Sequence, residues 1–229
     1  MKYIILKEFL KIRFAFFAFL ICALGICVAI IFGTNGQILT NSAARYISSV
    51  VFKMNFSFIW LDIANIFFTL LIGVFAFFPE RLNGRIRIQF HFPHSDFTNI
   101  LTTVLIPLCF VIFVFLCEFI ILKIYLNLVF PKNLNYHMIT ILFNNFAFCI
   151  TLFLAAPSFL IEPNLRRIVG FIIAQGLLIY IYFKINPDFI NLLSYGYNGE
   201  FSKFFIFCLI FAIISLVLSF FDYKQGYIK

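Results

Sequence analysis

Polar side chains inside the most apolar stretches of this sequence are its first candidates for chemistry. Five stand out: Asp62, Glu118, Asn144, Asn145 and Gln175. Ionisable and amide groups are costly in apolar surroundings, so such residues either line a path for a polar solute or join helices through hydrogen bonds. Asp62, Glu118 and the two asparagines fall in the same half of their stretches, and for them both interpretations stay open. Gln175, near the middle of its stretch, is expected to join helices.

Charge, glycine, proline and histidine crowd together in FFPERLNGRIRIQFHFPHSDF, residues 77–97. Pro79 is expected to end an apolar stretch, Gly84 to permit a bend and Ser95 to cap the helix that follows. From Leu82 onward an apolar side chain recurs every fourth position, which favours a helix along a membrane surface over a lone strand. The arginines of this connection are therefore expected to lie on a surface.

Motifs for catalysis, phosphate binding or metal binding do not emerge. His91 and His94 are close in sequence, but Pro93 lies between them and no third ligand is placed, so no metal site is predicted. None of the ten glycines is followed by lysine, so there is no phosphate-binding loop, and any ATP must be bound by another chain. No nucleophile elbow or H-E-x-x-H occurs, and no catalytic residue is predicted.

The composition is that of a membrane protein. Of the 229 residues, 64% are hydrophobic and 11% are charged, against about 25% charged in soluble domains. The net charge of +8 is scattered between apolar stretches and forms no basic stripe, which excludes a nucleic-acid-binding protein. The six cysteines lie inside apolar runs and are expected to be small buried hydrophobic residues.

Six apolar segments are long enough to cross the hydrocarbon layer as helices, which takes about 20 residues each. They are residues 14–33, 57–78, 100–126, 138–161, 167–185 and 203–221. The first is longer than the usual core of a signal peptide, so a retained span is expected. The connection 186–203, rich in turn formers and tyrosine, is expected outside the membrane.

The distribution of lysine and arginine predicts the orientation. If the connections alternate between the two sides, eleven of the 17 basic residues fall on one side and six on the other. The richer side is expected to be cytoplasmic. Both termini, the 79–99 connection and the 162–166 connection are then cytoplasmic, in a multi-pass protein of the inner (plasma) membrane.

Residues 1–13, MKYIILKEFLKIR, have the pattern of an amphipathic helix. Lys7, Glu8 and Lys11 cluster on one side, and apolar residues fill the other. Such a helix is expected to lie flat at the cytoplasmic interface as an elbow before the first span. The alternative is that it extends the first span inward, with its lysines reaching for water.

These features resemble the permease subunits of type-2 ABC exporters. In that family a glutamate, a glycine, a proline and a serine recur between the second and third spans, and Glu80, Gly84, Pro93 and Ser95 hold those places here. Phenylalanine and histidine stand where leucines are usual. The resemblance implies that segment 79–99 contains a coupling helix seated on a cytoplasmic ATPase subunit. The residues expected to couple are Glu80, Arg81, Gly84, Arg85, Arg87, Pro93 and Ser95.

The sequence therefore predicts an all-α membrane protein with one domain, residues 1–229, that moves a solute and catalyses no bond chemistry. The resemblance implies ATP and Mg²⁺ on partner ATPase subunits and a second permease copy or paralogue as a further partner. Within the family, the haem-exporter-like permease of cytochrome c maturation is similar in length and span number. The rival hypothesis is a polytopic membrane enzyme or assembly factor without an ATPase partner.

Overall fold

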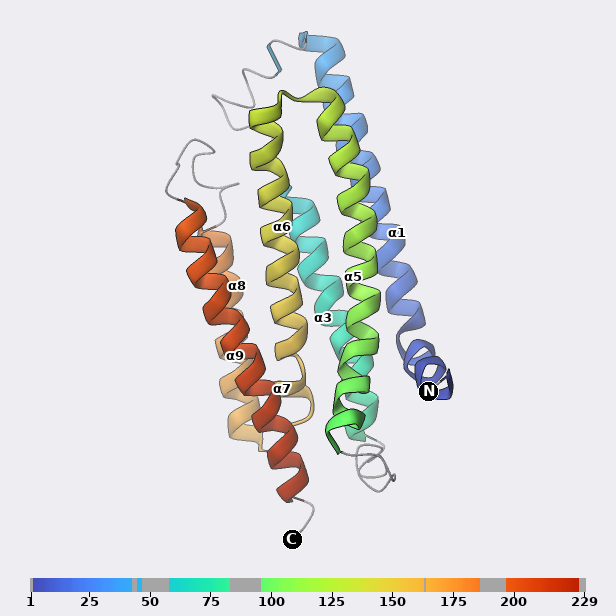
Figure 1. The fold of residues 1–229 in the computed structure, drawn as a ribbon, viewed down its shortest axis with the longest axis vertical. Helices are drawn as coiled ribbons and strands as arrows, with labels where there is room; N and C mark the ends of the chain where they lie inside the picture. Colours follow the sequence, from blue (N-terminus) through green and yellow to red (C-terminus); the bar gives the residue numbers. More distant parts are fainter. Residues whose placement is uncertain are drawn as a thin grey trace.

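The computed structural model describes residues 2–42, 45–46, 58–82, 96–162, 164–185 and 197–226, and all regular elements in this part of the chain are helices. In chain order these are α1 (Lys2–Asn41), α3 (Ile59–Leu82), α5 (Asp96–Val129), α6 (Lys132–Ala155), α7 (Pro157–Leu160), α8 (Leu165–Ile185) and α9 (Tyr197–Gly226). The long helices run alternately up and down one elongated bundle (Figure 1). The prediction of an all-helical fold is confirmed for the described residues.

Six stretches of these helices are long and apolar enough to cross a membrane, as predicted. They are Leu6–Thr40, Ile59–Pro79, Leu101–Val129, Leu134–Leu160, Leu165–Ile185 and Lys203–Phe221. Helices suit this setting because every backbone N–H and C=O finds its partner within the same segment. The chain is therefore a multi-pass membrane protein.

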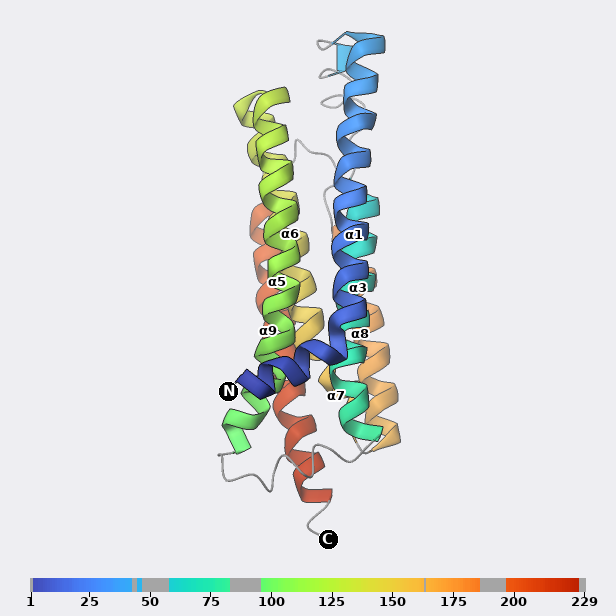
Figure 2. The same cartoon turned by 90° about the vertical axis from the view of Figure 1, so that its right-hand side faces the viewer.

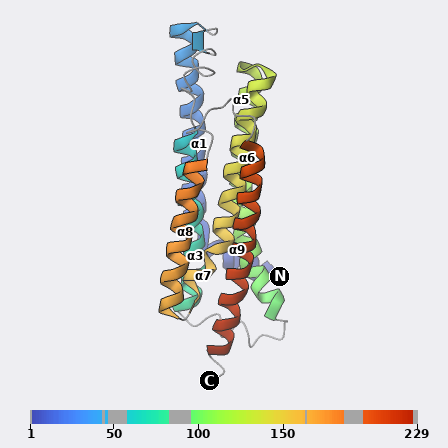
Figure 3. The same cartoon turned by 90° about the vertical axis from the view of Figure 1, so that its left-hand side faces the viewer.

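The long helices form two layers. Figures 2 and 3 show α1, α3 and α8 in one layer and α5, α6 and α9 in the other. Helix α6 is the most enclosed of the spans, and α8 is the least. The interior between the layers is therefore built around α3, α5 and α6, with α8 laid against one side.

The first turns of α1 run crosswise to the bundle before the helix turns along it (Figure 2). That this segment is an amphipathic helix lying at the interface stays a prediction. Glu8 is buried and its Oε2 accepts from Lys11 Nζ at 2.5 Å, whereas Leu6 and Leu10 are exposed. A carboxylate neutralised by a neighbouring ammonium can turn inward, and the leucines can face lipid at little cost. Phe9 packs on Phe110 of α5, with ring centroids 5.3 Å apart.

Several boundaries also differ from the prediction. Pro79 ends the apolar span, Ile59–Pro79, as predicted, but the helix itself, α3, continues to Leu82. A proline is tolerated there since it removes only one hydrogen bond, near the end of the helix. Helix α9 begins at Tyr197, inside the stretch predicted as a connection. Of the six cysteines predicted to be buried, Cys27, Cys149 and Cys208 are buried, Cys22 and Cys117 are half-buried and Cys109 is exposed on the surface of its span.

Candidate functional site

Five buried polar side chains from four helices form one connected network in the interior of the bundle. They are Asp62 and Asn65 of α3, Glu118 of α5, Asn145 of α6 and Tyr182 of α8. Asn65 Nδ2 donates to Glu118 Oε2 at 3.0 Å and to Asn145 Oδ1 at 2.9 Å. Asn145 Nδ2 donates to the Tyr182 hydroxyl at 3.1 Å, which in turn donates to Asp62 Oδ2 at 3.3 Å. The network thus runs from one carboxyl group to the other.

Helix α3 supplies the network with one polar face. Asp62, Asn65 and Thr69 follow at the spacing that places side chains on the same side of a helix, and all three are fully buried. The core residues near this polar face, such as Leu61, Ile66 and Leu122, are apolar and buried. The polar face is therefore enclosed by hydrophobic packing.

Aromatic packing orients the tyrosine of the network. The ring of Tyr182 stacks on Phe148 of α6, with centroids 4.3 Å apart and planes 1° from parallel. Phe183 meets the same ring edge-on at 5.4 Å. A ring held on both sides has little freedom, so the hydroxyl stays between Asn145 and Asp62.

Glu118 is the least compensated charge of the network. Its side chain is fully buried, and among the described residues its one hydrogen-bond donor is the neutral amide of Asn65. Lys123, further along α5, is exposed and lies over the ring of Phe119 at 5.5 Å. Within the described residues, two oxygens around this point lack a hydrogen-bond partner: Asn65 Oδ1 and Glu118 Oε1.

A second polar cluster lies where α6 gives way to α7. Pro157 interrupts the helix, and the carbonyl of Ala155 accepts from Ser158 Oγ at 2.6 Å and from Gln175 Nε2 at 2.8 Å. Ser219 Oγ of α9 donates to the Ser158 carbonyl at 3.3 Å. Side chains thereby satisfy carbonyls released by the break, as an apolar surrounding requires.

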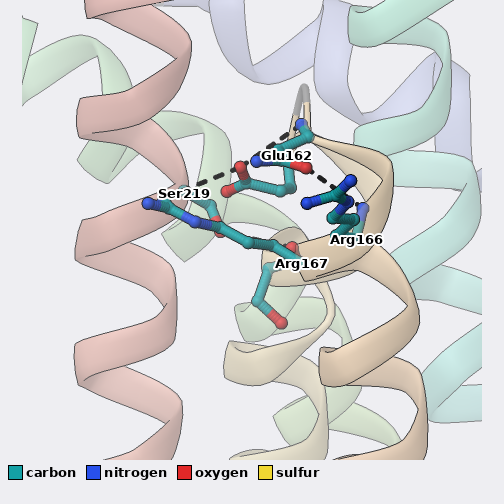
Figure 4. A network of polar contacts seen from close by, with 6 residues as sticks. Glu162, Arg166, Arg167 and Ser219 are labelled. Carbon is teal, nitrogen blue, oxygen red and sulfur yellow. Dashed lines mark hydrogen bonds and ion pairs between the residues drawn. The ribbon is translucent and has the colours of Figure 1, made fainter.

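The same cluster contains a buried glutamate at the turn into α8. Glu162 is fully buried, and its Oε1 lies 3.9 Å from Arg167 Nη1. Figure 4 shows Arg166 and Arg167 on opposite sides of Glu162. The backbone N–H of Asn164 donates to the same oxygen at 3.4 Å. Glu162 therefore anchors this turn, whose two arginines are exposed.

The structure brings together three of the five polar residues singled out in the sequence. Asp62, Glu118 and Asn145 share the network, although they are far apart in the chain. Asn144 is only half-buried, because one step along a helix turns its side chain away from the network. Gln175 belongs to the cluster at Pro157, where it joins helices as expected.

Three members of this region were not predicted from the sequence: Asn65, Thr69 and Tyr182. The helical spacing of Asp62, Asn65 and Thr69 was a readable signal. For Tyr182 the signal was its position seven residues after Gln175, which places both on one face of α8. Tyrosine in a span is usually found at a membrane interface. Because of this more common role, the sequence did not indicate that Tyr182 belongs to a buried network.

The residues expected to couple to an ATPase are described only in part. Gly84, Arg85, Arg87, Pro93 and Ser95 lie outside the described residues, as do His91 and His94. The backbone of Glu80 and Arg81 belongs to the last turn of α3. Helix α5 begins at Asp96, directly after the proposed cap.

An apolar groove of about 370 Å³ opens between α5, α6 and α9. Phenylalanines dominate its lining, and Phe115 and Phe146 stack there with centroids 4.7 Å apart. With no polar group to orient a solute, this groove suits lipid chains and offers nothing to a polar ligand.

No group of three or more histidine, cysteine, aspartate or glutamate side chains comes together as a metal site in the described part of the chain. Comparison of the chain with protein-family models, curated proteins and solved structures found no match.

Proposed function

We propose that this chain is the membrane-spanning permease subunit of an ATP-driven exporter of the ABC type. It lies in the inner (plasma) membrane with both ends in the cytoplasm and works as a dimer. Partner ATPase subunits bind ATP and Mg²⁺, and this chain converts their closure into movement of a solute.

One observation carries the proposal: the features expected to face an ATPase gather at one end of the bundle. The crosswise start of α1, the end of α3 and the start of α5 lie there, together with the turn before α8 and the end of α9 (Figures 1 and 2). The basic residues that the described part of the chain contributes to that end are Lys2, Lys7, Lys11, Arg13, Arg81, Arg166, Arg167 and Lys224. Such an end suits docking to a cytoplasmic protein.

The buried network supports mechanical coupling through the spans. A push on the connection between α3 and α5 acts on two helices that Asn65 and Glu118 tie together by a 3.0 Å hydrogen bond. Asn145 and Tyr182 extend the tie to α6 and α8. Helices joined in this way move as a body between two packed states, which is what alternating access requires.

The first test is copurification. The tagged chain is expressed with an ATPase that has a phosphate-binding loop and is encoded beside it. We expect a stable complex in detergent whose ATP hydrolysis rises when the solute is added. Purification of the tagged chain without any ATPase, from membranes that contain one, would contradict the proposal.

A charge-matched pair of variants tests the docking end. The triple change Arg81→Ala, Arg85→Ala and Arg87→Ala is expected to reduce solute-stimulated ATP hydrolysis at least about tenfold, the effect of losing roughly 1.4 kcal/mol of coupling. The control changes Lys123, Lys132 and Lys184 to alanine, removing the same charge from exposed positions toward the other end. Equal losses in both triple variants would show that net charge, and not docking, is responsible.

A further inference from the structure

We propose that the network of Asp62, Asn65, Glu118, Asn145 and Tyr182 is a binding site for a monovalent cation, a proton or a sodium ion. The site lies inside the bundle, among helices α3, α5, α6 and α8. This proposal does not depend on the ATP-driven function proposed above, because it concerns the charge balance of the interior and not the docking end.

The charge balance distinguishes Glu118 from other buried glutamates. Glu8 has Lys11 Nζ at 2.5 Å and Glu162 has Arg167 Nη1 at 3.9 Å. Glu118 is buried as completely, but it has no basic side chain within ion-pair distance among the described residues. A carboxylate removed from water without a partner is strongly destabilising, so a positive charge must reach it from solution.

Among the described residues, four helices contribute titratable or polar groups to the surroundings of Glu118 and its network, and none of these groups is basic. Helix α1 contributes Cys27, which lies within electrostatic reach of Glu118. Helix α3 contributes Asp62 and Asn65, α6 contributes Asn145 and Cys149, and α8 contributes Tyr182. No lysine, arginine or histidine is among the fully buried polar residues of the described chain. The network can therefore accept positive charge but cannot supply it.

Unpartnered oxygens provide an observation that does not depend on charge. Asn65 Oδ1, on a fully buried neutral side chain, has no hydrogen-bond partner among the described residues, and neither has Glu118 Oε1. Asn65 is fixed inside the network by its two donated hydrogen bonds. Contacts that serve only to hold helices together normally leave no such atoms. Carboxylate, amide and hydroxyl oxygens are the ligands that hard cations prefer.

Glu118, a carboxyl group that lacks a basic partner among the described residues, indicates that a single positive charge is needed. Within the described residues no third histidine, cysteine, aspartate or glutamate completes a metal-type cluster. A site with few charged ligands in an apolar surrounding suits a proton or a monovalent ion better than a divalent metal. Intramembrane carboxyl groups of this kind are typical of ion pathways and proton relays.

The test measures the unfolding temperature, Tm, of the purified full-length chain in detergent. In one arm, sodium chloride replaces N-methylglucamine chloride at constant ionic strength and alkaline pH. In the other, the pH is lowered without sodium. A ligand that binds only the folded state raises Tm by mass action, and saturation is expected to raise it by at least about 4 °C. A response to sodium identifies the ion, a response to pH alone identifies the proton, and no response in either arm overturns the proposal.

Isosteric variants assign the response to the network. Glu118→Gln removes the charge but keeps the shape, and Asp62→Asn provides a second variant should the first not fold. Either is expected to reduce the shift in Tm to less than about half. The matched control is Glu162→Gln, a fully buried glutamate beside Arg167, in which the wild-type shift is expected to persist. A full response in both Glu118→Gln and Asp62→Asn would place the cation elsewhere and overturn the proposal.

Discussion

Tyr182 shows how much a single residue can connect. Its hydroxyl accepts from Asn145 and donates to Asp62, so one oxygen joins α8 to both α6 and α3. The ring is held by its stacking on Phe148 at 4.3 Å. Hydrogen bonds between membrane helices are individually modest, about 0.6 kcal/mol on average and up to roughly 1.7 kcal/mol. The Tyr182 hydroxyl is important because it takes part in two interhelical hydrogen bonds at once.

Tyr182→Phe is expected to lower the free energy of unfolding by about 1 kcal/mol, because two interhelical hydrogen bonds are lost while the ring stacking remains. Detergent-induced unfolding in sodium dodecyl sulfate measures this change. Tyr180→Phe is the control, since Tyr180 is exposed on the same helix and its loss of a hydroxyl should have no effect. Equal effects of the two variants would mean that the network contributes nothing to stability.

Small residues and the polar groups of buried side chains determine how closely the helices approach one another. Helix α8 turns Gln175, Leu178 and Tyr182 toward the bundle, and two of these three make hydrogen bonds with it. Helix α3 meets the end of α6 at Gly73, where an added Cβ would lie 2.9 Å from Ala156 Cβ. Small residues allow such close packing where lipid supplies no hydrophobic driving force.

Gly73→Ala is expected to destabilise the protein by about 1–3 kcal/mol, because neither methyl group can swing aside and the helices must separate. The same unfolding assay applies. In Gly176→Ala nothing lies within 4 Å of the added carbon, so this control should be neutral or slightly stabilising. A neutral Gly73→Ala would show that the contact relaxes without cost.

For the whole molecule, the two layers and the up-and-down order place the start of α1 and the end of α9 at one end of the bundle (Figure 1). The basic residues of that end predict that it faces the cytoplasm. Docking to an ATPase is possible only in that orientation. The buried network, by contrast, is independent of which way the bundle is inserted.

Reporter fusions test the orientation. A fluorescent protein at the C-terminus is expected to be bright and alkaline phosphatase at the same place to be inactive. Phosphatase inserted between Val129 and Lys132, at the opposite end, is expected to be active. An active phosphatase at the C-terminus would show that the bundle has the opposite orientation, which would contradict the proposed function. The proposal of a cation site would not be affected.

Much of the fold was predictable because lipid imposes a simple rule. A run of about 20 apolar residues must become a helix to satisfy its backbone, so composition along the chain was sufficient to find the six spans. The facing of individual side chains was less predictable. Glu8 belongs to the side of residues 1–13 predicted to be charged, and the structure buries it with Lys11 Nζ as its partner.

The sequence by itself determined that the chain is helical, how many times it can cross a membrane and which polar residues lie inside the spans. Only the tertiary structure decided that Asp62, Glu118 and Asn145 meet, that Asn65 and Tyr182 join them, and that Asn144 and Gln175 do not. The physical reason is that insertion into lipid depends on each segment alone, whereas partners across helices depend on rotation and relative depth. Packing sets both, through contacts such as Gly73 on Ala156 and Phe148 on Tyr182.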